Sequence, residues 1–305
     1  MIDKISLSAE WLNSKKNEYK KDPSLIESMI HALYLLEQLR QTELDFIFKG
    51  GTSLILLLDR PARFSVDIDI IVNPKIEREL LENYLSKIIG DVFIKLELDE
   101  RRSYNGKIPK AHYKFIYKSN LVNKNIDGQI IQNPEREILL DILFAENPYP
   151  VLKEKSITTE WIKQVGAPLN VNVPCENSIA GDKLTAYAPN TIGVPYNVEK
   201  EKEIIKQLFD ISTLFDILSD IDVFRKSFYA TAKSEISYKS RGLTVEIVLQ
   251  DIIDTGIIIA KRDTQDKDNA AKFEELKKGI NQFGHFVYSG NFRIEEAQLA
   301  AAKAA

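Results

Sequence analysis

The stretch FIFKGGTSLILLLDRPARFSVDIDIIV, residues 46–72, decides the fold that we expect for the first half of the chain. It opens with a short apolar strand, which Gly50 and Gly51 end, and an apolar helix begins at Thr52. Residues 64–72 then alternate between apolar and polar side chains, which is typical of a strand. The stretch therefore predicts a strand, a glycine turn, a short helix and a second strand in succession.

Two aspartates, Asp67 and Asp69, share one face of the second predicted strand. Burying a carboxylate without partners costs several kcal/mol, so these side chains need a cation, a hydrogen-bond network or open solvent. The Asp-x-Asp spacing alone is weak evidence for a metal site, because it occurs twice more where we expect helix caps or solvated charges. These two further pairs are Asp220 with Asp222 and Asp266 with Asp268. Only the first pair lies in an apolar strand behind a glycine turn, and this context favours a metal site.

The glycine turn supplies the second half of the expected site. Gly50 and Gly51 lack side chains, so a phosphate can approach the backbone, and the following helix offers unpaired N–H groups and a positive dipole end. Thr52 and Ser53 add two hydroxyls at the same place. A glycine pair is more often an ordinary turn, but beside two carboxylates it indicates a cradle for nucleotide phosphates.

A phosphate cradle beside paired carboxylates indicates metal-assisted phosphoryl or nucleotidyl transfer, in which Mg²⁺ bridges triphosphate oxygens. A third carboxylate on a neighbouring strand would complete a two-metal site and help to deprotonate an acceptor hydroxyl. Asp141, within EILLDILF at 137–144, is the best candidate, and a buried structural carboxylate is its alternative. We therefore predict Mg²⁺ as the cofactor, an NTP as substrate, and three metal ligands: Asp67, Asp69 and Asp141.

Length and composition limit the class of protein. A chain of 305 residues predicts roughly two domains, and 44% hydrophobic with 28% charged residues is typical of a folded protein. The longest apolar stretch, 50–58, is shorter than the roughly 20 residues that span a bilayer, and the N-terminus has no apolar signal region. One cysteine, Cys175, and three scattered histidines do not make a zinc site. We expect a cytoplasmic protein with no membrane partner.

The net charge of −4 gives no overall attraction to nucleic acid, although a local basic patch can serve an RNA substrate. The local candidates near the N-terminus are Lys15, Lys16, Lys20 and Lys21, for which we favour a solvated helix face. The low-complexity end QLAAAKAA carries no functional prediction.

The pattern along the chain predicts an α+β fold followed by a C-terminal helical bundle. Asp22 and Pro23 mark the start of an amphipathic helix that continues to Arg40. The first half carries a sheet of about five strands, whose further members we expect at 92–98, 113–117, 125–131 and 138–144, with a helix at 77–89. The second half has almost no strand signal, and its expected helices span 178–188, 199–219, 223–233, 245–260 and 272–283.

The ordered motifs resemble those of the minimal nucleotidyltransferases, and specifically the AbiEii/AbiGii toxin family of bacterial toxin–antitoxin and phage-abortive systems. The resemblance rests on GGTSL at 50–54, RFSVDID at 63–69, DKLTA at 182–186 and KQLFDI at 206–211. Four motifs in the same order are far more specific than any one of them. The resemblance implies a nucleotidyltransferase-type mixed sheet with flanking helices in a domain of residues 1–195, and a helical bundle domain in residues 196–305.

Carried over residue by residue, the resemblance implies that Asp67 and Asp69 bind metal and that Asp141 supplies a further acid. Lys183 would contact the nucleotide phosphates, because an ammonium group binds phosphate as a point charge. Asp210 would be a catalytic or site-organising acid.

The acceptor side of the site stays open in the sequence. Lys206 and Asp210, at i and i+4, would serve equally as an ordinary helix ion pair. Gln207 stands where shorter members of the family have an acid, and the segment between Lys183 and Lys206 is long. These departures concern the acceptor more than the nucleotide.

The leading hypothesis is a Mg²⁺-dependent nucleotidyltransferase with toxin-like activity, which moves a nucleotide from an NTP to a hydroxyl acceptor. By resemblance, an RNA such as a tRNA end is a candidate acceptor, and a cognate antitoxin is expected as partner. The same site would serve a small-molecule acceptor, as in antibiotic-modifying nucleotidyltransferases, which the sequence pI of about 5.6 mildly favours. A third hypothesis is a non-catalytic nucleotide-binding or interaction protein, against which the presence of all three carboxylates argues.

Overall fold

The computed structural model describes residues 1–104, 109–124, 130–131, 134–239, 242–262, 266–288 and 290–305. The chain folds into two compact units, within each of which most contacts between residues are made. The first unit holds residues 1–147 and 153–173, and the second holds residues 148–152 and 174–305. Residues 174–195, which the sequence assigned to the first domain, cluster with the second unit, and the boundary between functional domains stays a prediction. None of the helices in the described residues has the length and apolar character that crossing a bilayer requires.

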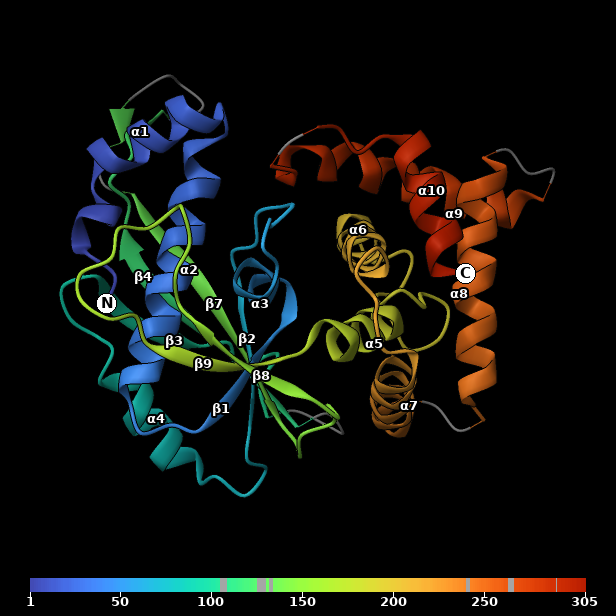
Figure 1. Ribbon diagram of the computed structural model, residues 1–305, viewed down its shortest axis with the longest axis horizontal. Helices are drawn as coiled ribbons and strands as arrows, with labels where there is room; N and C mark the ends of the chain where they lie inside the picture. Colours follow the sequence, from blue (N-terminus) through green and yellow to red (C-terminus); the bar gives the residue numbers. More distant parts are fainter. Residues whose placement is uncertain (105–108, 125–129, 132–133, 240–241, 263–265, 289) are drawn as a thin grey trace. The chain divides into compact units, whose positions relative to one another are not determined.

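A five-stranded mixed sheet forms the centre of the first unit (Figure 1). Its strands lie in the order β1–β2–β7–β4–β3, with the bounds β1 Phe46–Lys49, β2 Ile68–Val72, β7 Glu135–Phe144, β4 Lys110–Lys118 and β3 Phe93–Leu98. β2 and β7 pair in parallel, whereas the other neighbours are antiparallel. This sheet confirms the predicted α+β class and the expected number of strands.

Two short strand pairs lie outside the main sheet. They are β5 Asn123–Lys124 with β6 Ile130–Ile131, and β8 Leu152–Ser156 with β9 Asn170–Pro174. The strand predicted at 125–131 falls mostly outside the described residues, and the sequence did not predict β8 or β9.

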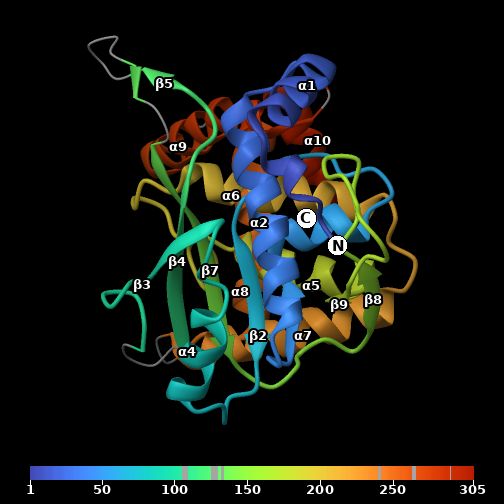
Figure 2. The same cartoon turned by 90° about the vertical axis from the view of Figure 1, so that its left-hand side faces the viewer.

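Helix α2, Pro23–Gln41, covers one face of the sheet (Figure 2). Its start confirms the prediction, because Asp22 caps the first turn and Pro23 is the first helical residue. His31 of this helix stacks on Tyr117 of β4, with 3.8 Å between the ring centroids. Burial lowers the pKa of His31 to about 4, because the charged ring would lose its hydration in this core.

The other helices of the first unit are η1 Lys4–Leu7, α1 Ala9–Tyr19, α3 Gly50–Leu57 and α4 Arg78–Ser86. Lys15 of α1 is buried, with its ammonium 3.0 Å from a Glu18 oxygen and within 5.4 Å of the ring centroids of Trp11 and Tyr19. The solvated face predicted for Lys15 is therefore wrong, because its long stem packs on aromatic rings.

The second unit is helical, which confirms the predicted C-terminal bundle. Its helices are α5 Glu176–Ala186, α6 Glu201–Phe215, α7 Ile221–Tyr238, α8 Val245–Lys261, α9 Lys267–Phe283 and α10 Ile294–Ala304, with the short η2 Gly284–Phe286. The apolar faces of these helices share one core. Asp220 and Asp266 cap α7 and α9 through their carboxylates, so the two other Asp-x-Asp pairs are helix caps as predicted.

Candidate active site

Four side chains form one row across the main sheet of the first unit. In the strand registers, Lys49 of β1 is opposite Asp69 of β2, Asp69 is opposite Asp141 of β7, and Asp141 is opposite His112 of β4. Cross-strand partners share a face, so the row carries two carboxylates between a lysine and a histidine. The sheet thus brings Asp69 and Asp141 together, although they are far apart in sequence.

Asp67 lies before β2, which begins at Ile68. The strand predicted at 64–72 is therefore wrong for residues 64–67. The carbonyl of Asp67 accepts a hydrogen bond from Thr52 Oγ1 at 2.5 Å. A side chain of α3 thus supplies the donor that a neighbouring strand would otherwise provide. Thr52 Oγ1 also lies 2.9 Å from Ser65 Oγ, whose hydroxyl can donate to it. A metal-binding role for the Asp67 carboxylate stays a prediction.

The glycine pair begins helix α3 instead of forming a turn ahead of it. Gly50 has φ +77°, and a Cβ there would stand 2.0 Å from Asp69 Oδ2. A Cβ on Gly51 would stand 2.4 Å from Arg63 Nη2 and 2.9 Å from Ser65 Oγ. Both glycines therefore give room to side chains of the protein itself, a carboxylate and a guanidinium.

The hydroxyls at the start of α3 are buried and engaged. Ser53 Oγ donates to the Gly50 carbonyl at 2.9 Å, and Thr52 Oγ1 holds the segment before β2 as described. In the structure, the Ser53 hydroxyl binds within the first turn of α3, and the Thr52 hydroxyl joins this turn to the backbone of Asp67. A phosphate-binding role for Gly50, Gly51, Thr52 and Ser53 stays a prediction.

Asp141 and His112 are in direct contact. His112 Nδ1 lies 2.5 Å from Asp141 Oδ1, and the two side chains are 11% and 30% exposed, respectively. Asp141 is thus partly accessible, which distinguishes it from the fully buried structural carboxylate that was its alternative. The sequence analysis missed His112, because the contact follows from the pairing of β4 with β7.

Lys183 and Asp210 form a buried ion pair in the second unit. Lys183 Nζ of α5 lies 2.9 Å from Asp210 Oδ2 of α6, and their side chains are 7% and 2% exposed. The neighbouring Asp182 accepts a hydrogen bond from the Tyr149 hydroxyl at 2.9 Å. Two of the resemblance motifs therefore meet through their charged residues.

The alternative partner proposed for Asp210 is not the one observed. Lys206 Nζ lies 3.0 Å from Glu203 Oε1 within α6, and 5.1 Å from the ring centroid of Phe286. Lys206 is therefore the member of an ordinary helix ion pair, whereas Asp210 pairs with Lys183.

The row across the sheet has donor chemistry that suits Mg²⁺. Asp69 and Asp141 lie on adjacent strands, whose backbones are about 5 Å apart, and present carboxylate oxygens to the same face. Among the described residues, no group of three or more His, Cys, Asp or Glu side chains stands ready to hold a metal ion. Two carboxylates nevertheless fit Mg²⁺, because this ion usually takes its other ligands from water and substrate phosphates.

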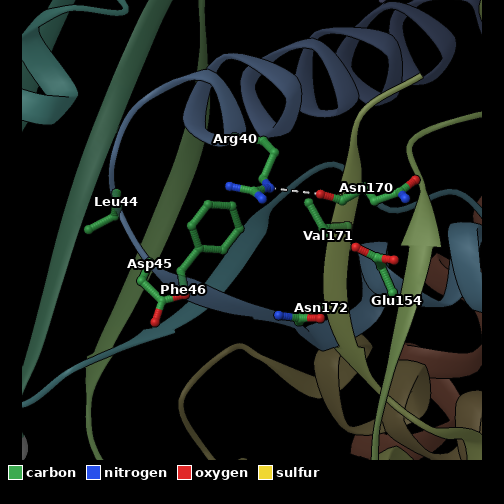
Figure 3. Close-up of a pocket in the computed structure, with 8 residues that line it drawn as sticks. All are labelled: Arg40, Leu44, Asp45, Phe46, Glu154, Asn170, Val171 and Asn172. Carbon is green, nitrogen blue, oxygen red and sulfur yellow. Dashed lines mark hydrogen bonds between the residues drawn. The ribbon is translucent and has the colours of Figure 1, made fainter. Parts of the chain in front are cut away.

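A polar pocket in the first unit lies apart from this row (Figure 3). Arg40 Nε donates to the carbonyl of Asn170 across it, at 2.8 Å. Its lining residues are Arg40, Leu44, Asp45, Phe46, Glu154, Asn170, Val171 and Asn172. None of the side chains predicted for the site lines this pocket, and its lining holds one guanidinium and two carboxylates, a balance that singles out no ligand.

Comparison with known proteins agrees with the motifs. A family model described as nucleotidyl transferase AbiEii toxin, type IV TA system, matches residues 34–285. This region includes the row across the sheet and the Lys183–Asp210 pair. The comparison with curated proteins found no match. Because the family model covers most of its length, the chain belongs to the AbiEii family of nucleotidyl transferase toxins of type IV toxin–antitoxin systems.

Proposed function

We propose that this protein is a Mg²⁺-dependent nucleotidyltransferase that moves a nucleotide from an NTP to a hydroxyl acceptor. The observation that carries the proposal is the register between Asp69 and Asp141 on adjacent parallel strands. The start of α3 lies against one of these carboxylates, so the positive end of a helix dipole and a candidate metal site are adjacent.

The residues divide the work of the transfer. Asp69 and Asp141, with Asp67 nearby, would hold Mg²⁺, which neutralises phosphate charge when bound. The acceptor oxygen attacks the α-phosphorus, the bond to the β-phosphate oxygen breaks, and pyrophosphate leaves. The hydroxyl proton passes to solvent water, and Asp141 would assist its loss as a ligand of the ion. Lys183 would contact the triphosphate, and Asp210 would fix the position of the Lys183 ammonium.

Helix α7 supports RNA as the acceptor. Arg225, Lys226, Tyr229 and Lys233 are exposed, and their spacing of one, three and four residues places them on one helical face. Within the described chain, no acidic side chain pairs with these three cations, whereas Lys272 and Lys277 of α9 each have one. Cations interleaved with an aromatic ring suit a phosphate backbone with stacked bases.

The biological setting follows from the family. We propose that the protein acts in the cytoplasm as the toxin of a two-component system and that a cognate antitoxin suppresses its activity. The support for a partner is the description of the family as a type IV toxin–antitoxin system.

A transfer assay tests the proposed function. The protein is incubated with Mg²⁺, total tRNA and each NTP labelled at the α-phosphorus. We expect label in the RNA with the wild type, none with Asp69→Asn, and wild-type labelling with Asp59→Asn, an exposed aspartate outside the row. The nucleotidyltransferase proposal fails if no label reaches RNA, protein or a panel of small hydroxyl acceptors.

The same assay separates the alternatives. Label in aminoglycosides but not in RNA would favour a small-molecule acceptor. Binding of NTP without transfer, together with an Asp69→Asn variant that behaves as the wild type, would favour a non-catalytic interaction protein. Growth arrest on expression that depends on Asp69 would support the toxin role.

A further inference from the structure

His112 stands at the end of the row across the sheet, and the contact with Asp141 is its defining feature. Nδ1 of His112 lies 2.5 Å from Asp141 Oδ1, and this is the single side-chain polar partner of Asp141 among the described residues. The other oxygen, Oδ2, has no side-chain partner among the residues that the structure describes, and it is the oxygen that could face a metal ion. Since the His112 side chain is only 11% exposed, its ring has little room to turn away.

The backbone of His112 is fixed independently of Asp141. Its N–H donates to Ser103 Oγ at 2.8 Å, while its carbonyl accepts from the Asp99 N–H at 2.9 Å. The Ser103 hydroxyl is buried and also lies 3.3 Å from the His112 carbonyl. Ser103 thus occupies the side of β4 that β3 leaves open beyond its last paired residue, Leu98. Both the strand and the ring of His112 are therefore held in place.

The contact also determines where the His112 ring carries its hydrogen. An ionised carboxylate only accepts hydrogen bonds, so a bond of this length requires a hydrogen on Nδ1. The lone pair on the neutral ring then lies on Nε2. This arrangement holds one oxygen of Asp141 and restricts rotation of its carboxylate.

We propose that His112 is a positioning residue for the cation site, which holds Asp141 so that Oδ2 faces the metal ion. The inference rests on the proposed function, because it presumes that Asp141 is a metal ligand. Hydrogen-bond partners behind a metal-binding carboxylate orient it, and their loss typically lowers metal affinity by about 10- to 100-fold. His112 acts through Asp141 and has no step of its own in the transfer.

Binding of Mn²⁺ alone, followed by electron paramagnetic resonance of the purified full chain, tests the proposal. His112→Phe keeps a ring of similar size but removes the donor, and we expect its Mn²⁺ dissociation constant to rise by about 10-fold or more. His112→Asn places an amide Nδ2 where Nδ1 stood and should restore most of the affinity. Asp141→Asn should weaken binding at least as much as His112→Phe.

The outcomes separate the inference from the function on which it rests. Equal Mn²⁺ affinity in the wild type and a folded His112→Phe, with weakened binding in Asp141→Asn, would overturn the positioning role alone. Failure of the wild type to bind Mn²⁺ would contradict the proposed metal site itself. Unchanged thermal unfolding without metal would show that His112→Phe keeps its fold.

A measurement on the wild-type protein keeps the inference testable if His112→Phe does not fold. The ¹⁵N chemical shifts of the His112 ring distinguish a hydrogen on Nδ1 from one on Nε2. We expect Nδ1 to be protonated, and Mn²⁺ to broaden the His112 signals more than those of the buried His31, on the α2 face of the sheet. A neutral ring with its hydrogen on Nε2 would overturn the proposal.

Discussion

The backbone of Gly50 lies directly against the carboxylate of Asp69, so that a Cβ on Gly50 would stand 2.0 Å from Asp69 Oδ2 and 2.8 Å from Asp69 Cβ. The side chain of Asp69 cannot keep its position if residue 50 has a methyl group. Gly50 also has φ +77°, a conformation that residues other than glycine adopt at a cost.

Gly50→Ala should therefore abolish nucleotide transfer and lower the free energy of unfolding by about 1–3 kcal/mol. Gly90→Ala is the matched control, because a Cβ at Gly90 would meet nothing within 4 Å. Urea unfolding and the labelled-NTP assay measure the two effects. Transfer at the wild-type rate by Gly50→Ala would show that the position of Asp69 is not needed for the reaction.

The Lys183–Asp210 pair allows its structural and functional roles to be separated. Removing one partner alone leaves a buried charge uncompensated, so we expect Lys183→Met or Asp210→Leu to lose about 3–5 kcal/mol of stability. The double variant should recover most of that stability, because an apolar pair can replace a buried ion pair. Under the proposed function it should still be inactive. Transfer by the double variant would reduce the pair to a structural element.

His31 should make stability depend on pH. Its pKa is about 4 in the folded protein and near 6.5 when unfolded, so the unfolded chain binds more protons in between. Stability is fully present above pH 6.5 and falls as the pH drops to 4, by about 3 kcal/mol over this window. Urea unfolding of the wild type and of His31→Phe should show this difference in slope. Parallel pH profiles for the two proteins would contradict it.

Helix α10 should be essential for the stability of the second unit. Ala300 is completely buried, whereas the adjacent Leu299 is 61% exposed. A buried carboxylate without partners is costly, so Ala300→Asp should lose about 3 kcal/mol or more. Leu299→Asp, the same new side chain one position away, should change stability by only about 0.5 kcal/mol. Equal melting temperatures for the two variants would contradict the packing of α10.

Local patterns in the sequence predicted the elements whose signals are themselves local. The Asp22–Pro23 start of α2 and the caps of α7 and α9 are of this kind, since each depends on residues within one turn. The alternation at 64–72 misled at its start, because apolar and polar residues can alternate in sequence without pairing to a strand, and Ser65, Val66 and Asp67 are all half-buried. There, Thr52 binds the carbonyl of Asp67 instead.

Contacts between distant segments could not be predicted in the same way. His112 meets Asp141, and Lys183 meets Asp210, only after strands or helices have paired. The low-complexity end QLAAAKAA likewise gave no sign that Ala300 and Ala301 fill a core, because small residues pack closely only against a surface that the sequence does not display. The sequence motifs identified candidate residues, but the pairing of strands and the packing of helices determined which of them are neighbours.

The order of the strands determines when the carboxylate pair can form during synthesis of the chain. Asp69 is translated early, but its neighbour β7 comes more than sixty residues later, and β2 and β7 pair in parallel across this long connection. A nascent chain that has not yet released residues 135–144 from the ribosome holds Asp69 without Asp141. The carboxylate pair therefore forms only after the last strand of the main sheet has emerged, and under the proposed function a chain truncated before β7 would be inactive.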